Sequence, residues 1–179
     1  MLLTSQETLM HPQTACFTGH RQLDQNELPA LVMRLDQVLN KLYEMGYRRF
    51  ISGGAMGFDL LAAERVIQLR NRCPDVSLIL ALPCATQTQS WPVAEGQRYE
   101  KIIYAADETH VLSSFYFSGC MMVRNRFMVD RSSFVVCYLT NTKGGTASTA
   151  AYAMKQEIPL LNTAMPDACT AFCQSITSV

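Results

Sequence analysis

The sequence lacks the cysteine patterns that mark metal sites and disulfide frameworks. Its seven cysteines form no CxxC pair and no Cys/His cluster at zinc spacing. An odd, scattered set is typical of reduced thiols in a cytoplasm, and Cys16 and Cys137 lie inside apolar runs, as small buried hydrophobic residues do. A redox or metal role for Cys169 and Cys173, four residues apart, is the less favoured alternative. We therefore predict no metal site.

Net charge and long apolar runs are also missing. Fifteen basic residues balance fifteen acidic ones, which excludes a general attraction to nucleic acid or to an anionic membrane but leaves a local basic patch open. The longest apolar run, Val76–Leu82, is too short to span a bilayer, and Met1–Gln13 lacks the features of a signal peptide. We expect a cytoplasmic protein without membrane contact, with a 1–13 N-terminal extension and a single domain over 14–179.

Two common phosphate-binding signatures are absent. The chain contains no GxxxxGK[ST] and no GxGxxG, so neither P-loop chemistry nor ordinary NAD dehydrogenase chemistry is supported. We accordingly predict no cofactor.

Short β-rich runs alternate with helical periods along the chain. The strands are expected at 14–18, 48–52, 76–82, 109–113, 133–139 and 158–161, with helices at 28–42, 58–71, 118–132 and 146–156. A further helix, which follows Trp91-Pro92, is expected to carry Tyr99, Ile102, Ile103 and Ala106. The tail from Ala164 leaves one more helix open. This alternation predicts an α/β fold, a Rossmann-like three-layer sandwich with a mostly parallel sheet.

Three strand-to-helix loops are predicted to meet at the carboxyl edge of that sheet, where α/β proteins bind ligands. Glycines allow close backbone approach, and the N-terminus of a helix favours an anion. A plain tight turn would be the better interpretation of one such loop, but two double-glycine loops favour a phosphate cradle. The candidate residues are Gly19, His20, Arg21, Ser52, Gly53, Gly54, Ala55, Gly57, Asp59, Lys143, Gly144, Gly145, Thr146 and Ser148.

Four side chains have both a structural and a functional interpretation. Asn125 lies in a helical stripe of Met and Val residues, so its amide needs either strand-end backbone partners or a ligand. Arg124 could bind a phosphate bidentately. Trp91, the only tryptophan, could stack on a base or cap the core. Asp59 could charge its helix N-terminus, bond the glycine loop or contact a ribose, the first two being favoured. A catalytic His20 would need a partner that the sequence does not reveal.

Five pieces of the sequence together resemble the YpsA-like proteins. They are Thr18-Gly-His-Arg21, Ser52-Gly-Gly-Ala-Met-Gly-Phe-Asp59, Trp91, Arg124-Asn-Arg126 and Lys143-Gly-Gly-Thr146. These belong to the SLOG superfamily, which is named for DprA/Smf and the Lonely guy (LOG) enzymes. The resemblance spans about Thr14 to Asn162. It implies a Rossmann-like fold and the sensing of a nucleotide or nucleotide derivative.

The sequence departs from both better-known relatives. LOG enzymes hydrolyse nucleoside monophosphates and carry the motif PGGxGTxxE, whose Glu is catalytic, together with an Arg on the preceding helix. Arg124 could match that Arg. In the motif, however, Ala147 and Ser148 replace Gly and Thr, and Ala151 stands in the Glu position. Loss of a positioned acid or base removes on the order of 10²–10⁴ in rate. The Ser52–Asp59 and Arg124–Arg126 runs look like loops of DprA, but the accessory domains and basic charge of DprA are missing.

The sequence thus favours a non-catalytic nucleotide-binding or sensing protein, with a nucleotide-like small molecule as its partner. We expect His20-Arg21 and Arg124-Asn125 to join the glycine loops around one site. One alternative is a hydrolase of N-glycosidic or phosphate bonds that uses His20, Asp59 or Glu95. The other is a DprA-like single-stranded nucleic-acid-binding protein. A homo-oligomer is plausible.

Overall fold

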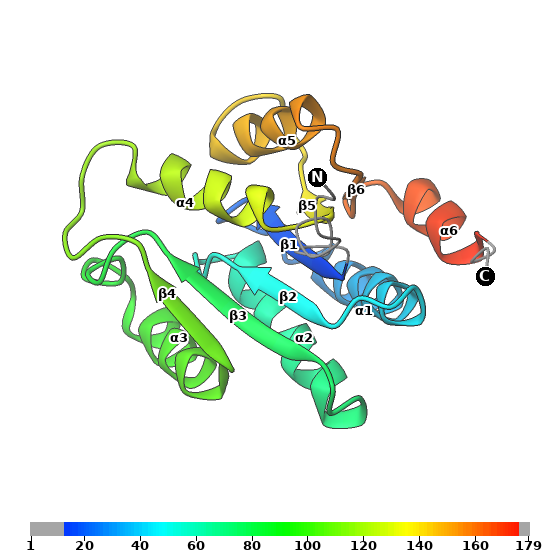
Figure 1. The fold of residues 1–179 in the computed structure, drawn as a ribbon, viewed down its shortest axis with the longest axis horizontal. Helices are drawn as coiled ribbons and strands as arrows, with labels where there is room; N and C mark the ends of the chain where they lie inside the picture. The colour runs from blue at the N-terminus through cyan, green and yellow to red at the C-terminus, as the bar shows by residue number, and fades with distance from the viewer. Residues whose placement is uncertain (1–12, 176–179) are drawn as a thin grey trace, which may run out of the picture.

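The computed structural model describes residues 13–175, and six parallel strands form its single sheet in the order β4-β3-β2-β1-β5-β6 (Figure 1). The strands are β1 (Thr14–Gly19), β2 (Arg49–Ser52), β3 (Ser77–Leu82), β4 (Glu108–Val111), β5 (Phe134–Tyr138) and β6 (Leu160–Asn162). The predicted Rossmann-like α/β fold is confirmed. Of the predicted N-terminal extension, residues 1–12 lie outside the described part.

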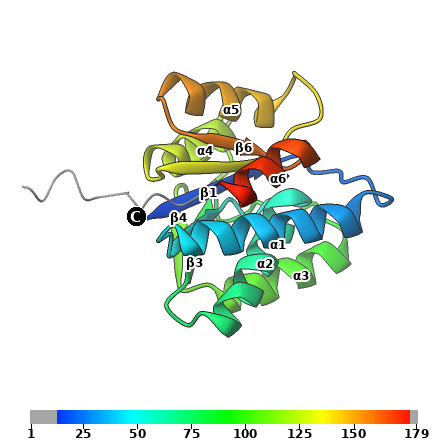
Figure 2. The same cartoon turned by 90° about the vertical axis from the view of Figure 1, so that its right-hand side faces the viewer.

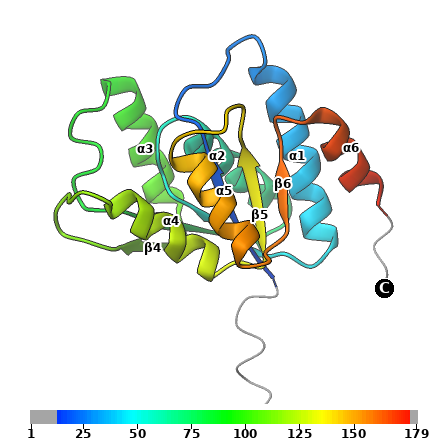
Figure 3. The same ribbon diagram turned by 90° about the horizontal axis from the view of Figure 1, so that it is seen from above.

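Helices cover both faces of the sheet, as Figure 2 shows. One face carries α1 (Leu28–Glu44), α2 (Phe58–Arg72) and α3 (Val93–Ala105), and the other carries α4 (Cys120–Asp130) and α5 (Gly145–Lys155). The last helix, α6 (Pro166–Gln174), lies beside α1 (Figure 3). No described helix is long and apolar enough to cross a membrane.

The helices change face because the strand order reverses. From β1 to β4 the chain moves steadily toward one edge, and it then returns through α4 to β5, which pairs with β1. Right-handed crossovers in opposite directions put their helices on opposite faces. The reversal lies between β1 and β5, and ligands of open α/β sheets bind at such a point.

Buried apolar patterns explain why these elements form. All five residues of β5 are buried, as expected for a central strand covered on both faces. Leu31, Leu35, Val38 and Leu42 form the buried stripe of α1. Gly46, at φ 96°, takes the left-handed conformation that ends this helix.

Most boundaries differ from the sequence prediction by one or two residues, as two examples show. Helix α4 begins at Cys120 rather than Ser118, because Gly119 takes a left-handed conformation (φ 92°) as the N-cap. Strand β4 ends at Val111 instead of Ser113. The uncertain tail forms α6, with Pro166 in its first turn, where a missing N–H costs no hydrogen bond.

Candidate functional site

The first glycine loop, between β2 and α2, is closed by the protein's own groups. Ser52 Oγ donates to the Asp59 carbonyl (2.8 Å) and accepts the Gly54 N–H (3.2 Å). The Phe58 N–H, at the start of α2, donates to the His20 carbonyl (3.1 Å). Gly53, Gly54, Ala55 and Gly57 are all buried. The Gly54 and Phe58 N–H groups, which a phosphate would need as hydrogen-bond donors, therefore already have acceptors within the protein.

Arg124 fills the space in front of this loop. Its Nη1 donates to the Gly53 carbonyl and lies 3.6 Å from Asp59 Oδ2, and both side chains are buried. A Cβ at position 53 would overlap the guanidinium, so only glycine leaves room for it. On the neighbouring side, Gln87 Nε2 lies between the Gly54 carbonyl (3.4 Å) and the Tyr99 hydroxyl (3.1 Å). The side chains of Arg124 and Gln87 thus occupy the space in front of the loop.

Burial disfavours the charged forms of Asp59 and Arg124. It raises the pKa of Asp59 to about 6, although Arg124, the Ala55 N–H and Arg21 each act to lower that pKa. Burial likewise lowers the pKa of Arg124, while the Asp59 charge raises it. The two groups support each other's charged forms and only partly offset the loss of water. Removing either charge leaves its partner buried and unpaired.

The second glycine loop, before α5, is open. Lys143, Gly144 and Gly145 are exposed, and apart from the adjoining backbone no heavy atom of residues 13–175 lies within 4 Å of the place where a Cβ on either glycine would stand. Within the described chain, no side chain caps the N-terminus of α5. The Ser148 hydroxyl turns back to the Gly144 carbonyl (3.1 Å). The first N–H groups of a helix have no partner inside it, so this backbone is free to meet a ligand.

A pocket of about 340 Å³ lies between α4 and α5 at this open loop. It is lined by Gly119, Met121, Met122, Asn125, Arg126, Gly145, Ser148, Thr149 and Tyr152. The Arg126 guanidinium lies 5.3 Å from the centre of the Tyr152 ring, whose hydroxyl donates to Asp130 (2.7 Å). The pocket therefore combines the first turns of two helices, one arginine and mainly apolar walls.

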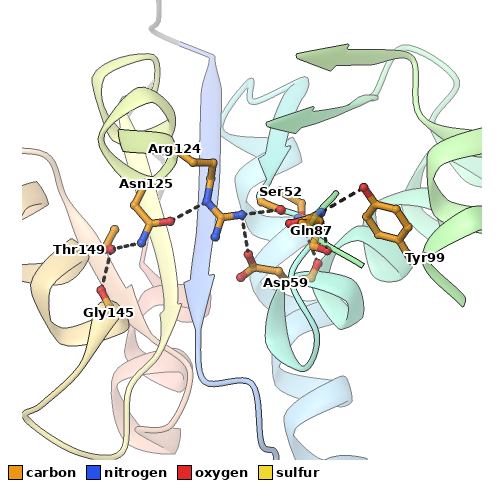
Figure 4. A network of polar contacts seen from close by, with 10 residues as sticks. Ser52, Asp59, Gln87, Tyr99, Arg124, Asn125, Gly145 and Thr149 are labelled. Carbon is orange, nitrogen blue, oxygen red and sulfur yellow. Dashed lines mark hydrogen bonds and ion pairs between the residues drawn. The ribbon is translucent and has the colours of Figure 1, made fainter. Parts of the chain in front are cut away.

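A chain of hydrogen bonds joins the two loops (Figure 4). Arg124 Nε donates to Asn125 Oδ1 (2.7 Å), Asn125 Nδ2 donates to Thr149 Oγ1 (2.8 Å), and Thr149 Oγ1 donates to the Gly145 carbonyl (2.8 Å). Asn125 thus finds its partners in two side chains, while it also lines the pocket. The sequence had offered strand-end backbone groups or a ligand as its partners.

The remaining predicted residues lie elsewhere along the sheet edge. His20 Nε2 accepts the Thr140 N–H (3.0 Å), which ties the end of β1 to the end of β5. Trp91 packs edge-on against Tyr99, with ring centres 5.4 Å apart, in the core-capping position. Arg21 and Gly57 line a separate cavity of about 470 Å³ beside α1, α2 and α3. The predicted residues therefore do not surround one cavity.

Six pocket residues escaped the sequence prediction of the site: Gly119, Met121, Met122, Arg126, Thr149 and Tyr152. Ser148 and Tyr152 are one helical turn apart, and that spacing is a signal that could have placed Tyr152 on the same face. Arg126 lies over the Tyr152 ring, and the Tyr152 hydroxyl donates to Asp130. Thr149 and Gly119 carry no such signal, because only the packing of α4 on α5 brings them together.

Comparisons with solved structures support the fold. DprA from Streptococcus pneumoniae matches with a TM-score of 0.61 at 16% identity, over 91% of this chain and 54% of that one. DprA from Helicobacter pylori matches with a TM-score of 0.60 at 22% identity, over 87% of this chain and 67% of the other. At these identities the likeness concerns the fold alone.

Curated relatives are similar in sequence and uncharacterised. The prophage-derived protein YoqJ of Bacillus subtilis is 29% identical over 143 residues, which are 71% of this chain and 84% of YoqJ. A UPF0398 protein of Halalkalibacterium halodurans is 29% identical over 115 residues, or 63% of this chain and 61% of its own length. The family model YpsA, described as the YspA SLOG family, matches residues 16–162. The chain belongs to this YspA SLOG family.

Proposed function

We propose that the pocket between α4 and α5 binds a nucleotide or nucleotide derivative, with a phosphate at the N-terminus of α5. The observation that carries the proposal is the open, uncapped start of α5 at Gly144 and Gly145, which faces a pocket of about 340 Å³. Free N–H groups and the helix dipole both favour an anion at this point.

The other pocket residues suit the rest of such a ligand. Arg126 supplies a guanidinium for charge-assisted hydrogen bonds to phosphate, and Ser148 supplies a hydroxyl. Met121, Met122 and Tyr152 offer thioether and aromatic surfaces against which a base can pack. The pocket thus offers both polar groups and apolar surface to a ligand.

The chemistry of the pocket supports binding without catalysis. None of the described residues that line it is Asp, Glu or His. Ala151, in the position of the LOG glutamate, is exposed on α5. The acid–base groups of the hydrolase alternative lie elsewhere: His20 holds Thr140, Asp59 is buried beside Arg124, and Glu95 lines the cavity on the opposite face.

Binding of single-stranded nucleic acid is the less favoured function. The Helicobacter pylori DprA structure is described in terms of a single-stranded DNA binding mode. In this chain, Arg124 of the similar Arg-Asn-Arg run is buried against Gly53, and only Arg126 is exposed. A groove for nucleic acid needs several exposed cations along the strand. Salt-dependent binding of an oligonucleotide that Arg126→Ala abolishes would favour this alternative.

Ligand screening tests the proposal. Thermal shift with mono-, di- and cyclic nucleotides, ADP-ribose and NAD should reveal stabilisation by at least one compound, since binding to the folded state raises the melting temperature. Calorimetry should then show that Arg126→Ala weakens its binding about 10- to 100-fold, as expected for a lost hydrogen bond to a charged group. Stabilisation by no compound in the panel would contradict the proposal.

Arg131→Ala is the matched control. Arg131 follows the last residue of α4, is exposed, and packs on the Phe127 ring at 3.7 Å, much as Arg126 packs on Tyr152. Its loss should leave affinity unchanged. Assays for released base or ribose 5-phosphate on the same panel separate binding from hydrolysis, and release that His20→Ala or Asp59→Ala abolishes would favour the enzyme instead.

A further inference from the structure

An apolar surface extends from the edge of the pocket along the segment from Val111 to Val123, which we call the aromatic segment. It runs from the end of β4 into the first turn of α4 (Figure 1). Phe115, Tyr116 and Phe117 are consecutive and are 77%, 65% and 46% exposed. Met122 and Val123 on α4 and Val111 at the end of β4 are each half exposed. Exposed aromatic residues in succession are unusual on the surface of a monomer.

The exposed area approaches that of a stable interface. With about 200 Å² for each fully exposed aromatic side chain, the three rings present roughly 350–400 Å². Val111, Met122 and Val123, at the two ends of the segment, bring its total exposed apolar area to roughly 600 Å². A standard protein–protein interface buries about 800 Å² on each partner. The aromatic segment can therefore supply most of one side of such an interface.

The charge pattern of the segment indicates the kind of partner. No Asp, Glu, Lys, Arg or His occurs from Val111 to Val123, although 17% of the whole chain is charged. A phosphate backbone or an anionic membrane would need cations here, which the segment lacks. Two copies of an uncharged surface meet without like-charge repulsion, so charge does not oppose the pairing of the segment with a second copy of itself.

The backbone of the segment is held in place before any partner arrives. Ser113 Oγ donates to the Phe115 carbonyl (2.7 Å) and accepts the Phe115 N–H (3.3 Å). The segment also lies at the edge of the sheet, since β4 is an edge strand (Figure 3). A preorganised, accessible surface loses little entropy when it is buried.

We propose that the aromatic segment is the interface of a two-fold homodimer, in which it packs against the same segment of a second copy. A two-fold interface uses the same patch on both subunits, and the uncharged segment meets that requirement. The dimer does not depend on the proposed function. Met122 belongs to both the segment and the nucleotide pocket, so the partner would lie beside the mouth of the pocket.

Sedimentation velocity on the full chain tests the dimer. The wild-type protein should sediment at twice its mass of 20.0 kDa and dissociate on dilution. Phe115→Asp should weaken dimerisation at least about 30-fold, as loss of a central aromatic contact does. Tyr104→Asp is the matched control, because Tyr104 on α3 is 94% exposed and lies outside the segment. This variant should dimerise like the wild type.

Two results would overturn the proposal. One is a wild-type protein that stays monomeric up to about 500 µM, a concentration far above the dissociation constants of standard-size interfaces. The other is a Phe115→Asp variant, folded by circular dichroism, that dimerises as tightly as the wild type. Binding of an oligonucleotide or of phosphatidylserine vesicles by a monomeric protein, lost in Phe115→Asp, would assign the segment to that partner. None of these results depends on nucleotide binding.

Discussion

The glycine loop before α2 and the glycine loop before α5 look alike in sequence and differ in what occupies the space in front of them. Both follow a parallel strand of the sheet and both open a helix. At Gly53 that space holds the Arg124 guanidinium, whereas at Gly145 the described part of the chain places no heavy atom, beyond the adjoining backbone, within 4 Å of the point that a Cβ would occupy. Glycine is needed in the first loop for internal packing, and in the second it leaves the backbone accessible.

A double-glycine loop at a sheet edge can hold a cation of the protein itself, as at Gly53, or leave its backbone exposed to solvent, as at Gly145. In this chain the loops are joined through Arg124, Asn125 and Thr149, so the closed loop supports the open one. The following substitutions are ordered from the largest expected effect to the smallest.

Arg124→Met should lower the free energy of unfolding by about 3–5 kcal/mol near pH 8, because it leaves the Asp59 carboxylate buried without a cation. Arg124 is the strongest influence that lowers the pKa of Asp59, so this pKa should rise further above about 6 in the variant. A carboxyl group with a raised pKa contributes stability that is complete below its unfolded pKa and is lost as the pH rises through its folded pKa.

The loss caused by Arg124→Met should therefore be smaller near pH 5 than near pH 8, at about 1.4 kcal/mol for each unit by which the pKa of Asp59 rises in that range. Urea unfolding of variant and wild type at both pH values measures it. Arg131→Met, which removes an exposed arginine, is the control. An equal loss at both pH values would show that Asp59 does not respond to Arg124.

Gly53→Ala and Gly145→Ala form a matched pair that tests the contrast directly. A methyl group at position 53 displaces the buried guanidinium, so stability should fall by about 1–3 kcal/mol. At position 145 it meets open space within the first turn of α5, so stability should stay constant or rise by up to about 1 kcal/mol. Equal shifts of the urea midpoint in the two variants would contradict the contrast between the closed and the open loop.

Thr149→Val should lower stability by about 1–2 kcal/mol, because the Asn125 amide loses its acceptor inside the α4–α5 contact. Thr149→Ser keeps the hydroxyl and should cost less than the valine variant. Thermal unfolding of both variants measures the link between the loops. A valine variant as stable as the serine variant would mean that the hydrogen-bond chain contributes nothing.

The sequence predicted the order of elements well because buried runs such as Phe134–Tyr138 and the stripe of α1 are local patterns. It also placed both glycine loops at the sheet edge. It did not separate them, since the Arg124–Asp59 pair joins residues far apart in the chain. The pocket depends on how α4 packs on α5, which no local pattern encodes, so Gly119 and Thr149 were not placed in one site.

The most direct test of the contrast between the closed and the open loop follows backbone amides during a ligand titration. Two-dimensional ¹⁵N–¹H spectra of the labelled protein, titrated with AMP and then with ADP-ribose, report which loop meets the phosphate. We predict that the largest shifts occur at Gly119 and at Gly144–Ser148, with little change at Gly53–Phe58. The largest shifts at Gly53–Phe58, with the α5 loop unchanged, would contradict an open phosphate site before α5.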